Sequence, residues 1–175
     1  MTVAETPATE KKLPQENRLT AGGSTGSNPA LDKELVDRLA HLAAAAQKKA
    51  YAPYSGFAVG AALLCADGTI YQGCNIENAA FGPSNCAERT AFFKAVSEGK
   101  RNFIAMAVCG GRPGEPAAVC PPCGVCRQVA EEFCRPDFVF VLTGPKEPQL
   151  LTLAELLPYS FSLSPEADQK DGGGV

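Results

Sequence analysis

The chain has 175 residues, of which 45% are hydrophobic, and this composition suits one globular domain whose core needs no disulfide bonds. Its 16 basic and 19 acidic residues give a formal charge of -3, and no cluster of Lys and Arg suggests a phosphate-binding groove, which argues against a nucleic-acid polymer as substrate. No apolar run is long enough for a signal peptide or a membrane span, so we expect a cytoplasmic protein with no membrane partner.

Composition along the chain predicts three segments. Residues 1–28 are rich in polar residues, Pro and Gly, and ordering them would cost entropy with little burial in return, so we expect a disordered extension. Residues 29–165 carry the apolar periodicity of a folded domain. Residues 166–175 end in a glycine run and predict a flexible tail.

The predicted elements alternate between helix and strand. The expected helices are one capped by Ser27 or Asn28 and running to Lys49, then Cys86–Glu98, Cys123–Phe133 and Leu153–Leu157, the last capped by Thr152. The expected strands are Phe57–Cys65 and Thr69–Cys74, joined by an Asp67-Gly68 hairpin turn, then Phe103–Cys109 and Phe138–Leu142. This order predicts an α/β fold, a mixed sheet with helices on both faces.

Three of the eight cysteines stand at the start of predicted helices. Cys86 opens one helix, and Cys123 and Cys126 open another. Exposed amides and the positive end of a helix dipole favour thiolate over thiol at such positions, and thiolate is the form that zinc binds. In a chain without an export signal, thiols and metal ligands are better expected than disulfides.

Three thiolates leave one tetrahedral position of a zinc ion open, which separates a catalytic site from a structural one. Glu88 follows Cys86 by two residues in the same first helical turn, close enough to exchange protons with a water molecule there. The spacing therefore predicts a hydrolytic zinc site with Glu88 as its acid and base.

The sequence around these residues resembles that of the cytidine deaminases. The matching elements are Tyr54-Ser-Gly-Phe-Ala-Val-Gly-Ala-Ala62, Gly73-Cys-Asn-Ile-Glu-Asn-Ala79, Cys86-Ala-Glu-Arg-Thr-Ala91, Pro122-Cys-Gly-Val-Cys-Arg-Gln128, and Leu156-Leu-Pro158 with Phe161. The resemblance covers about residues 32–165 and implies an α/β/α sandwich and hydrolytic deamination of cytidine and deoxycytidine to uridine and deoxyuridine, in pyrimidine salvage.

The resemblance also implies roles for individual residues. The catalytic proton carrier is Glu88, and one Zn²⁺ per subunit is held by Cys86, Cys123 and Cys126. The residues expected to contact the substrate are Phe57, Asn75, Glu77, Ala87 and Phe161. Two arginines, Arg89 and Arg127, are expected to hydrogen-bond the thiolates. Similar enzymes form homotetramers whose subunits complete each other's sites, and Phe81 is our candidate for a residue offered across the interface.

Other interpretations of the motifs remain open at this level. A structural zinc module needs a fourth ligand, for which Cys74 and Cys120 are available, while the only histidine, His41, lies far away in the first helix. The Cys123-x-x-Cys126 spacing also suits redox sites. A blasticidin-type deaminase shares the cysteine ligands, whereas deoxycytidylate and nucleic-acid deaminases generally have His in place of Cys86. Departures from the family wording at Ala58, Pro121, Val125 and Ala130 bear on pocket shape and leave the ligands intact.

Overall fold

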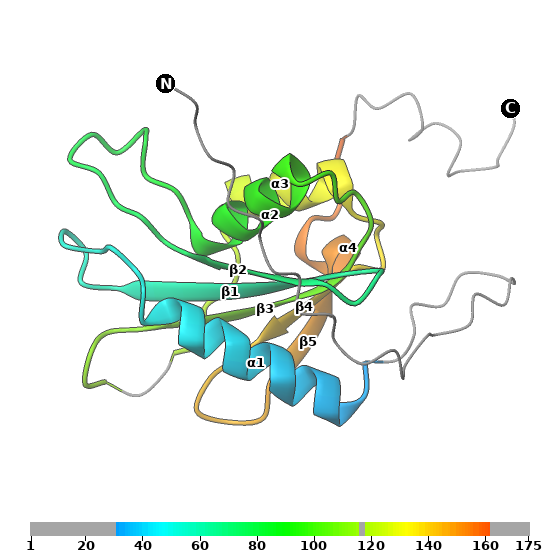
Figure 1. Cartoon of the computed structure of the whole chain (residues 1–175), viewed down its shortest axis with the longest axis horizontal. Coiled ribbons are helices and arrows are strands. Elements are labelled where there is room, and N and C mark those ends of the chain that lie inside the picture. The colour runs from blue at the N-terminus through cyan, green and yellow to red at the C-terminus, as the bar shows by residue number, and fades with distance from the viewer. Residues whose placement is uncertain (1–30, 116–117, 162–175) are drawn as a thin grey trace, which may run out of the picture.

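A computed structural model describes residues 31–115 and 118–161 (Figure 1). In chain order its elements are α1 (Lys33–Gln47), β1 (Ala58–Cys65), β2 (Ile70–Cys74), α2 (Ala87–Ser97), β3 (Phe103–Gly111), α3 (Gly124–Phe133), β4 (Val139–Leu142), β5 (Gln149–Thr152) and α4 (Leu153–Leu156). The strands form one sheet in the order β2-β1-β3-β4-β5. The neighbours β3 and β4 run parallel and the other pairs run antiparallel, so the predicted mixed sheet is confirmed.

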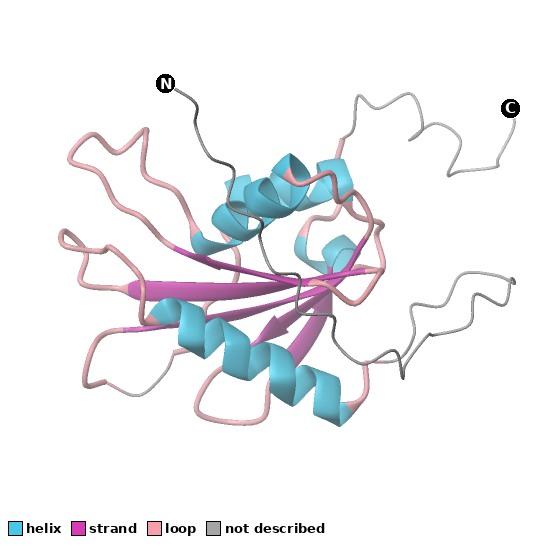
Figure 2. Ribbon diagram, in the orientation of Figure 1, coloured by secondary structure: helices cyan, strands magenta, loops and turns pink. Residues whose placement is uncertain are grey.

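Helices cover both faces of this sheet (Figure 2). α1 lies alone on one face, and α2, α3 and α4 lie on the other. Each face has its own core: Leu39 and Ala43 of α1 pack over one, and Phe92 of α2 packs with Phe138 and Phe140 over the other. The predicted three-layer α/β/α sandwich is therefore confirmed, while the predicted extension 1–28 and tail 166–175 lie outside the described residues.

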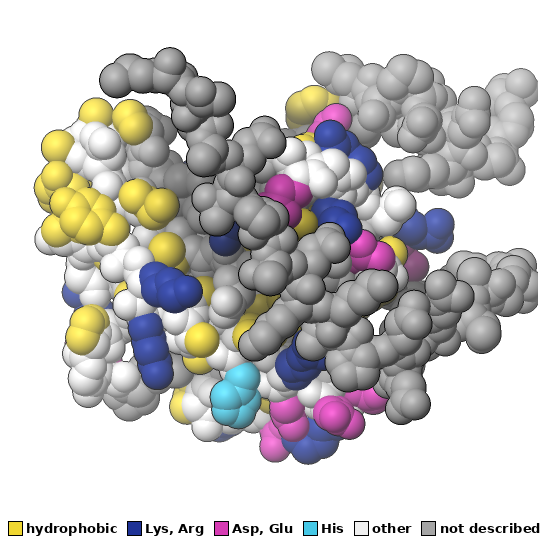
Figure 3. All heavy atoms as spheres, viewed as in Figure 1, with side chains coloured by type: hydrophobic (Ala, Val, Ile, Leu, Met, Phe, Trp, Pro, Cys, Tyr) yellow, Lys and Arg dark blue, Asp and Glu magenta, His cyan; other side chains and the backbone are white. Residues whose placement is uncertain are grey.

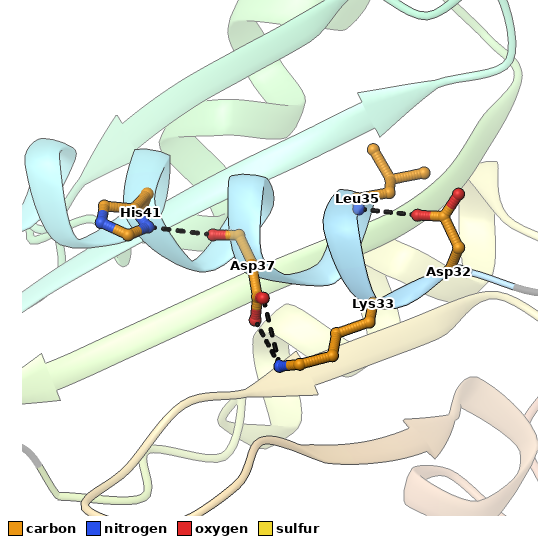
Figure 4. A network of polar contacts seen from close by, with 5 residues as sticks. All are labelled: Asp32, Lys33, Leu35, Asp37 and His41. Carbon is orange, nitrogen blue, oxygen red and sulfur yellow. Dashed lines mark hydrogen bonds and ion pairs between the residues drawn. The ribbon is translucent and has the colours of Figure 1, made fainter.

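The start of α1 differs from its prediction. Asp32 is the N-cap, because its carboxylate accepts a hydrogen bond of 2.8 Å from the Leu35 amide, and Lys33 forms an ion pair with Asp37 in the same first turns (Figure 4). The expected cap at Ser27 or Asn28 is wrong: those residues lie outside the described part, and the helix begins at Lys33. An aspartate cap satisfies the amides at the helix start just as Ser or Asn would.

The structure also contains a strand that the sequence did not reveal. β5 is only four residues long, and it pairs with β4 at the edge of the sheet. Thr152 ends this strand and caps α4 at once, with its hydroxyl accepting from the Glu155 amide while the Glu155 carboxylate accepts from the Thr152 amide. The cap at Thr152 was predicted, but four residues are too few to show the alternation that identifies a strand.

Two glycines let helices approach the sheet closely. A β-carbon at Gly73 of β2 would lie 2.2 Å from the Ala87 carbonyl oxygen of α2, and one at Gly60 of β1 would lie 2.1 Å from the Ala43 carbonyl oxygen of α1. Atoms at such distances would overlap, so only glycine fits. The first contact matters for function, because it sets the depth at which the N-terminus of α2 rests on the sheet.

None of the helices in residues 31–115 and 118–161 combines the length and hydrophobicity that a membrane span requires.

Candidate metal and substrate site

The N-termini of α2 and α3 bring three cysteines together. Cys86 and Cys123 occupy the N-cap positions of α2 and α3 in extended backbone conformations, and Cys126 lies buried one turn into α3. Neither N-cap side chain bonds its own helix start, so both sulfurs are available for other partners. Helix starts thus supply the positive electrostatic environment expected from the sequence.

The spacing of the sulfurs matches a metal site. The Sγ atoms of Cys86, Cys123 and Cys126 all lie within 4.8 Å of one another. Cys86 Sγ is 3.8 Å from Cys123 Sγ, which is 3.5 Å from Cys126 Sγ. Thiolates at about 2.3 Å from a tetrahedral zinc ion stand about 3.8 Å apart. The cluster therefore fits a zinc ion with little rearrangement, and its three cysteines form no disulfide.

Arg89 supports the thiolate of Cys86. Its Nη2 atom donates to Cys86 Sγ at 3.6 Å and to the Ser84 carbonyl oxygen at 3.2 Å. Hydrogen bonds from Cys126, then from Arg89 and Cys123, lower the pKa of Cys86 to about 5 against the opposing effect of burial. The same sharing raises the pKa of Cys126, because its proton is held between the two sulfurs. These hydrogen bonds favour the thiolate form at Cys86, which is the form that zinc binds.

Glu88 is the only charged or polar residue among the buried ones in the described part of the chain, with 4% of its surface exposed. Burial raises the pKa of its carboxyl group, and the negative charge of Cys86 acts in the same direction. A raised pKa brings a carboxylate closer to the range in which it can both accept and return a proton. A buried carboxyl group with a raised pKa beside clustered cysteines makes Glu88 a candidate functional residue.

A cavity of about 350 Å³ opens onto this cluster. Residues from the β1 start, the β2–α2 loop, the α2 start and the loop before α3 line it: Val59, Asn75, Ile76, Glu77, Phe81, Ser84, Asn85, Cys86, Ala87, Glu88, Arg89, Cys120, Pro121 and Cys123. Four of the predicted substrate or interface residues are among them, namely Asn75, Glu77, Ala87 and Phe81.

Asn75 and Glu77 hold the backbone around the cavity. The side-chain oxygen of Asn75 accepts from the Val59 backbone amide at 2.7 Å, and its side-chain nitrogen donates to the Phe57 carbonyl oxygen at 2.9 Å. Oε2 of Glu77 accepts from the amides of Tyr54 and Ser55, and hydrogen bonding by Ser55 lowers the pKa of this carboxyl group. Both side chains therefore fix the cavity wall.

The two other predicted aromatic contacts lie outside the cavity wall of a single chain. Phe57 is partly buried beside Cys120, and a β-carbon at Gly110 would touch both side chains. Phe161 is 66% exposed, and its carbonyl accepts from Gln128. Phe81 lines the cavity and yet is 87% exposed, in the loop between β2 and α2. Hydrophobic side chains gather on the left of the face shown in Figure 3.

Arg127 has other partners than the sequence suggested. Its Nε donates to the Pro122 carbonyl at 2.8 Å and its Nη1 to the Leu156 carbonyl at 2.6 Å. These contacts tie α4 to the loop that presents Cys123. The expected hydrogen bond to a thiolate is absent from the contacts of Arg127 within the described residues, whereas Arg89 makes such a bond.

The candidates for a fourth ligand lie outside the cluster. Cys120 lines the cavity without joining the three clustered sulfurs, and burial followed by the charge of Glu88 raises its pKa to about 11. Cys74 donates to the Lys49 carbonyl. His41 lies exposed on α1, across the sheet from the cysteines, with its ring bonded to the Asp37 carbonyl (Figure 4). Within the described residues, three sulfurs form the donor set.

Sequence reasoning missed Asn85, the residue just before Cys86. Its backbone exchanges two hydrogen bonds with Ile76, and these join the residues just before Cys86 to the Asn75-Ile76-Glu77 segment. Its side-chain nitrogen donates to the Thr90 hydroxyl, which donates to the Cys86 carbonyl. The contact crosses nine positions of an irregular loop, so periodicity has no means of showing it.

An α/β/α sandwich that gathers three thiols and a buried carboxylate around one cavity defines a candidate metal-dependent hydrolase. The chain belongs to the family described as the cytidine and deoxycytidylate deaminase zinc-binding region, whose model matches residues 33–142. Enzymes of this family are hydrolases that act on carbon–nitrogen bonds, and they are zinc proteins.

Individual relatives agree with this membership. The chain is 52% identical to a cytidine deaminase of Sporosarcina psychrophila over 128 residues, covering 73% of this chain and 91% of the relative. It is 50% identical over 120 residues to a cytidine deaminase of Halalkalibacterium halodurans, covering 67% and 86%.

Solved structures resemble the fold as well. A crystal structure of cytidine deaminase from Burkholderia pseudomallei matches with a TM-score of 0.66 at 45% identity, covering 71% of this chain and 98% of that one. The cytidine deaminase of Mycobacterium tuberculosis matches with a TM-score of 0.62 at 38% identity, covering 73% and 97%.

Proposed function

We propose that this protein catalyses the zinc-dependent hydrolytic deamination of cytidine and deoxycytidine, giving uridine or deoxyuridine and ammonia. The observation that carries the proposal is the buried carboxyl group of Glu88, which lines one cavity with Cys86 and Cys123, two of the three clustered cysteines. Membership of the deaminase family and the cytidine deaminases at 50–52% identity support the reaction.

The three sulfurs would hold one zinc ion per subunit. Three thiolates overcompensate a divalent ion by one charge, and the guanidinium of Arg89 offsets part of that excess at Cys86. When bound, zinc supplies the Lewis acidity that makes a water molecule acidic near neutral pH.

Glu88 would carry the protons of the reaction. Its carboxylate takes a proton from the attacking water and delivers it to N3 of the pyrimidine as oxygen adds to C4. It then moves the second proton of that water from the new C4 hydroxyl group to the departing amine, as the C4 carbonyl forms and the C4–N bond breaks. Burial raises the pKa of Glu88, which suits a group that must both accept and release a proton. The carboxylate begins and ends the cycle ionised, so ammonia and uridine are the net products.

The remaining residues of the cavity suit a nucleoside. We assign Asn75 and Glu77 to the ribose 3′-hydroxyl, the backbone of Ala87 to the pyrimidine edge, and Phe57 and Phe161 to packing around the nucleoside. Glu77 lines the cavity, and its Oε2 accepts from the amides of Tyr54 and Ser55. A carboxylate offers about four acceptor sites, so the group can also accept from a ribose hydroxyl group.

The charges in the cavity favour a nucleoside over a nucleotide. The charged residues in its wall, apart from the cysteines, are Glu77, Glu88 and Arg89, and the arginine is engaged with Cys86 and Ser84. A phosphate group would meet acidic side chains without a free cation to pair with. We therefore expect cytidine and deoxycytidine to be deaminated much faster than CMP or dCMP.

The decisive test measures ammonia release from cytidine, deoxycytidine, CMP, dCMP and blasticidin S, comparing the wild-type protein with Glu88→Gln. Glutamine keeps the size of the side chain and removes its proton chemistry, so we expect full zinc content and a kcat lower by about 10²–10⁴-fold. Stoichiometric zinc with no deamination by the wild-type protein would instead indicate a structural zinc module. Turnover of blasticidin S alone would move the substrate to the nucleoside analogue.

The cellular setting we propose is pyrimidine salvage in the cytoplasm. All eight cysteines are free in the structure, which suits a reducing compartment. A salvage enzyme acts on free nucleosides, in agreement with the charge pattern of the cavity.

We further propose that the enzyme is a homotetramer in which Phe81 reaches a neighbouring subunit's site. The supporting observation is the exposure of Phe81 and Phe161 in the single chain, 87% and 66%, since exposed aromatic side chains of this size commonly mark an interface. Because Phe81 already borders the cavity at its mouth, a neighbouring copy packed there would lie against the substrate.

Subunit mixing tests this assembly. Phe81→Ala and Glu88→Gln should each have low activity alone, whereas oligomers reassembled from both should regain activity. In the mixed oligomer an intact Glu88 from one subunit meets an intact Phe81 from the other. A monodisperse wild-type monomer with full activity would contradict the proposal.

A further inference from the structure

Residues 51–57, in the loop between α1 and β1, do not line the cavity but are hydrogen-bonded to Glu77, which does. We propose that Arg112 is a positioning residue that clamps this loop and so sets the affinity for the nucleoside. The inference rests on the proposed function, since its effect is measured on deamination of cytidine.

Arg112 follows the last residue of β3 and contacts the loop far away in sequence. Its Nη1 atom donates to the Ser55 carbonyl oxygen at 2.8 Å. A β-carbon at Gly56 would lie only 3.2 Å from the same nitrogen, so the guanidinium packs directly on this residue. Gly56 has a φ of +64°, a conformation that other residues rarely adopt. Glycine at this position therefore allows both the backbone turn and the close approach of the Arg112 guanidinium.

Glu77 holds the same peptide segment from the other side. Its Oε2 atom accepts from the Tyr54 amide at 2.8 Å and from the Ser55 amide at 3.2 Å. The N–H group of Ser55 thus points to a carboxylate and its C=O group to a guanidinium. Both hydrogen bonds are charge-assisted, so they hold the backbone of Ser55 more strongly than neutral hydrogen bonds would.

A short chain of hydrogen bonds connects this clamp to the residues predicted to contact the substrate. The Ser55 hydroxyl accepts from the Phe57 amide at 2.9 Å, and the Phe57 carbonyl accepts from Asn75. Glu77 is at once a clamp residue and our candidate for the ribose hydroxyl. When Arg112 is lost, the Ser55 carbonyl is released, and Phe57 and Glu77 lose a fixed position relative to each other.

Arg112 itself does not border the candidate site. It lines a separate hollow of about 470 Å³, together with Lys48 near the end of α1. Glu88 and the three cysteines belong to other elements and share no hydrogen bond with the clamped loop among the described residues. Loss of the clamp should therefore weaken binding while leaving the chemical step intact, which is the signature of uniform binding.

The experiment compares kcat and KM for cytidine in the wild-type protein, Arg112→Gln, Arg112→Lys and Lys48→Gln. Lys48 is the matched control, because it borders the same hollow, carries the same charge, and has no side-chain partner among the described residues. We expect Arg112→Gln to raise KM about threefold to tenfold with kcat within twofold, as for the loss of one exposed charge-assisted hydrogen bond. Arg112→Lys should recover most of the affinity, and Lys48→Gln should match the wild type.

A second substrate identifies the route of the effect. Cytidine and 3′-deoxycytidine differ only in the hydroxyl group assigned to Glu77, and Arg112→Gln should narrow the difference between their kcat/KM values. An unchanged KM in Arg112→Gln, an equal rise in Lys48→Gln, or a fall in kcat alone would each overturn the positioning role. Wild-type protein that releases no ammonia from cytidine would instead overturn the proposed function, and this inference with it.

Discussion

The contact between β2 and α2 at Gly73 offers a sharp test of how the fold positions the site. Replacing Gly73 with Ala places a β-carbon 2.2 Å from the Ala87 carbonyl oxygen and 2.5 Å from the Ala91 amide nitrogen. Real β-carbons essentially never come within 3.0 Å of such atoms, so strand and helix must separate by almost 1 Å. Cys86 and Glu88 stand at the end of α2 that has to move.

Two consequences follow from that displacement. Overpacking should lower the free energy of unfolding by about 1–3 kcal/mol. A shift of about 1 Å in Glu88 relative to α3 should reduce kcat by about tenfold to a hundredfold, because proton transfer depends steeply on geometry. Both should be measured on protein whose zinc content and folding are checked by metal analysis and thermal unfolding.

Gly60→Ala provides the matched control. Its β-carbon would lie 2.1 Å from the Ala43 carbonyl oxygen, an overlap as severe as that at Gly73, and it would push against α1 on the opposite face of the sheet. We expect a similar loss of stability with a much smaller change in kcat. Wild-type kcat in Gly73→Ala, or an equal loss in Gly60→Ala, would refute the reasoning that the depth of α2 sets the catalytic geometry.

Three further perturbations have defined outcomes. Cys123→Ser should abolish stoichiometric zinc binding, measured by metal analysis, and bring ammonia release to background, whereas Cys74→Ser, which changes a thiol outside the cluster, should retain both. Hydrogen bonding with Lys100 lowers the pKa of Asp67 to about 2, below its unfolded value near 3.9, so this stabilisation is present above about pH 5 and is lost as the pH falls toward 2; unfolding curves of Asp67→Asn and wild type should differ at pH 6 and converge near pH 2. Thr152→Ala removes the cap of α4 and should cost about 1 kcal/mol in chemical denaturation, and an unchanged midpoint would contradict the capping role.

The sequence by itself determined the parts of this protein that depend on local patterns. Helical spacing predicted the positions of α2 and α3, and the Asp67-Gly68 turn predicted the β1–β2 hairpin, in which Gly68 has a φ of +83°. The cysteines and Glu88 were found in the same way, because the first turn of a helix places neighbouring residues around one point. Family wording then named the chemistry.

Only the tertiary structure decided which distant groups meet. β5 was invisible, because a four-residue strand at the sheet edge depends on pairing with β4 rather than on its own pattern. Arg127 binds backbone carbonyls of the α3 loop and α4, while Asn85 and Arg112 join segments that no periodicity relates. Local sequence patterns set the conformation of each helical turn and hairpin. Contacts between side chains of different loops depend on how the whole sheet and its helices pack, and the site is built from both kinds of constraint.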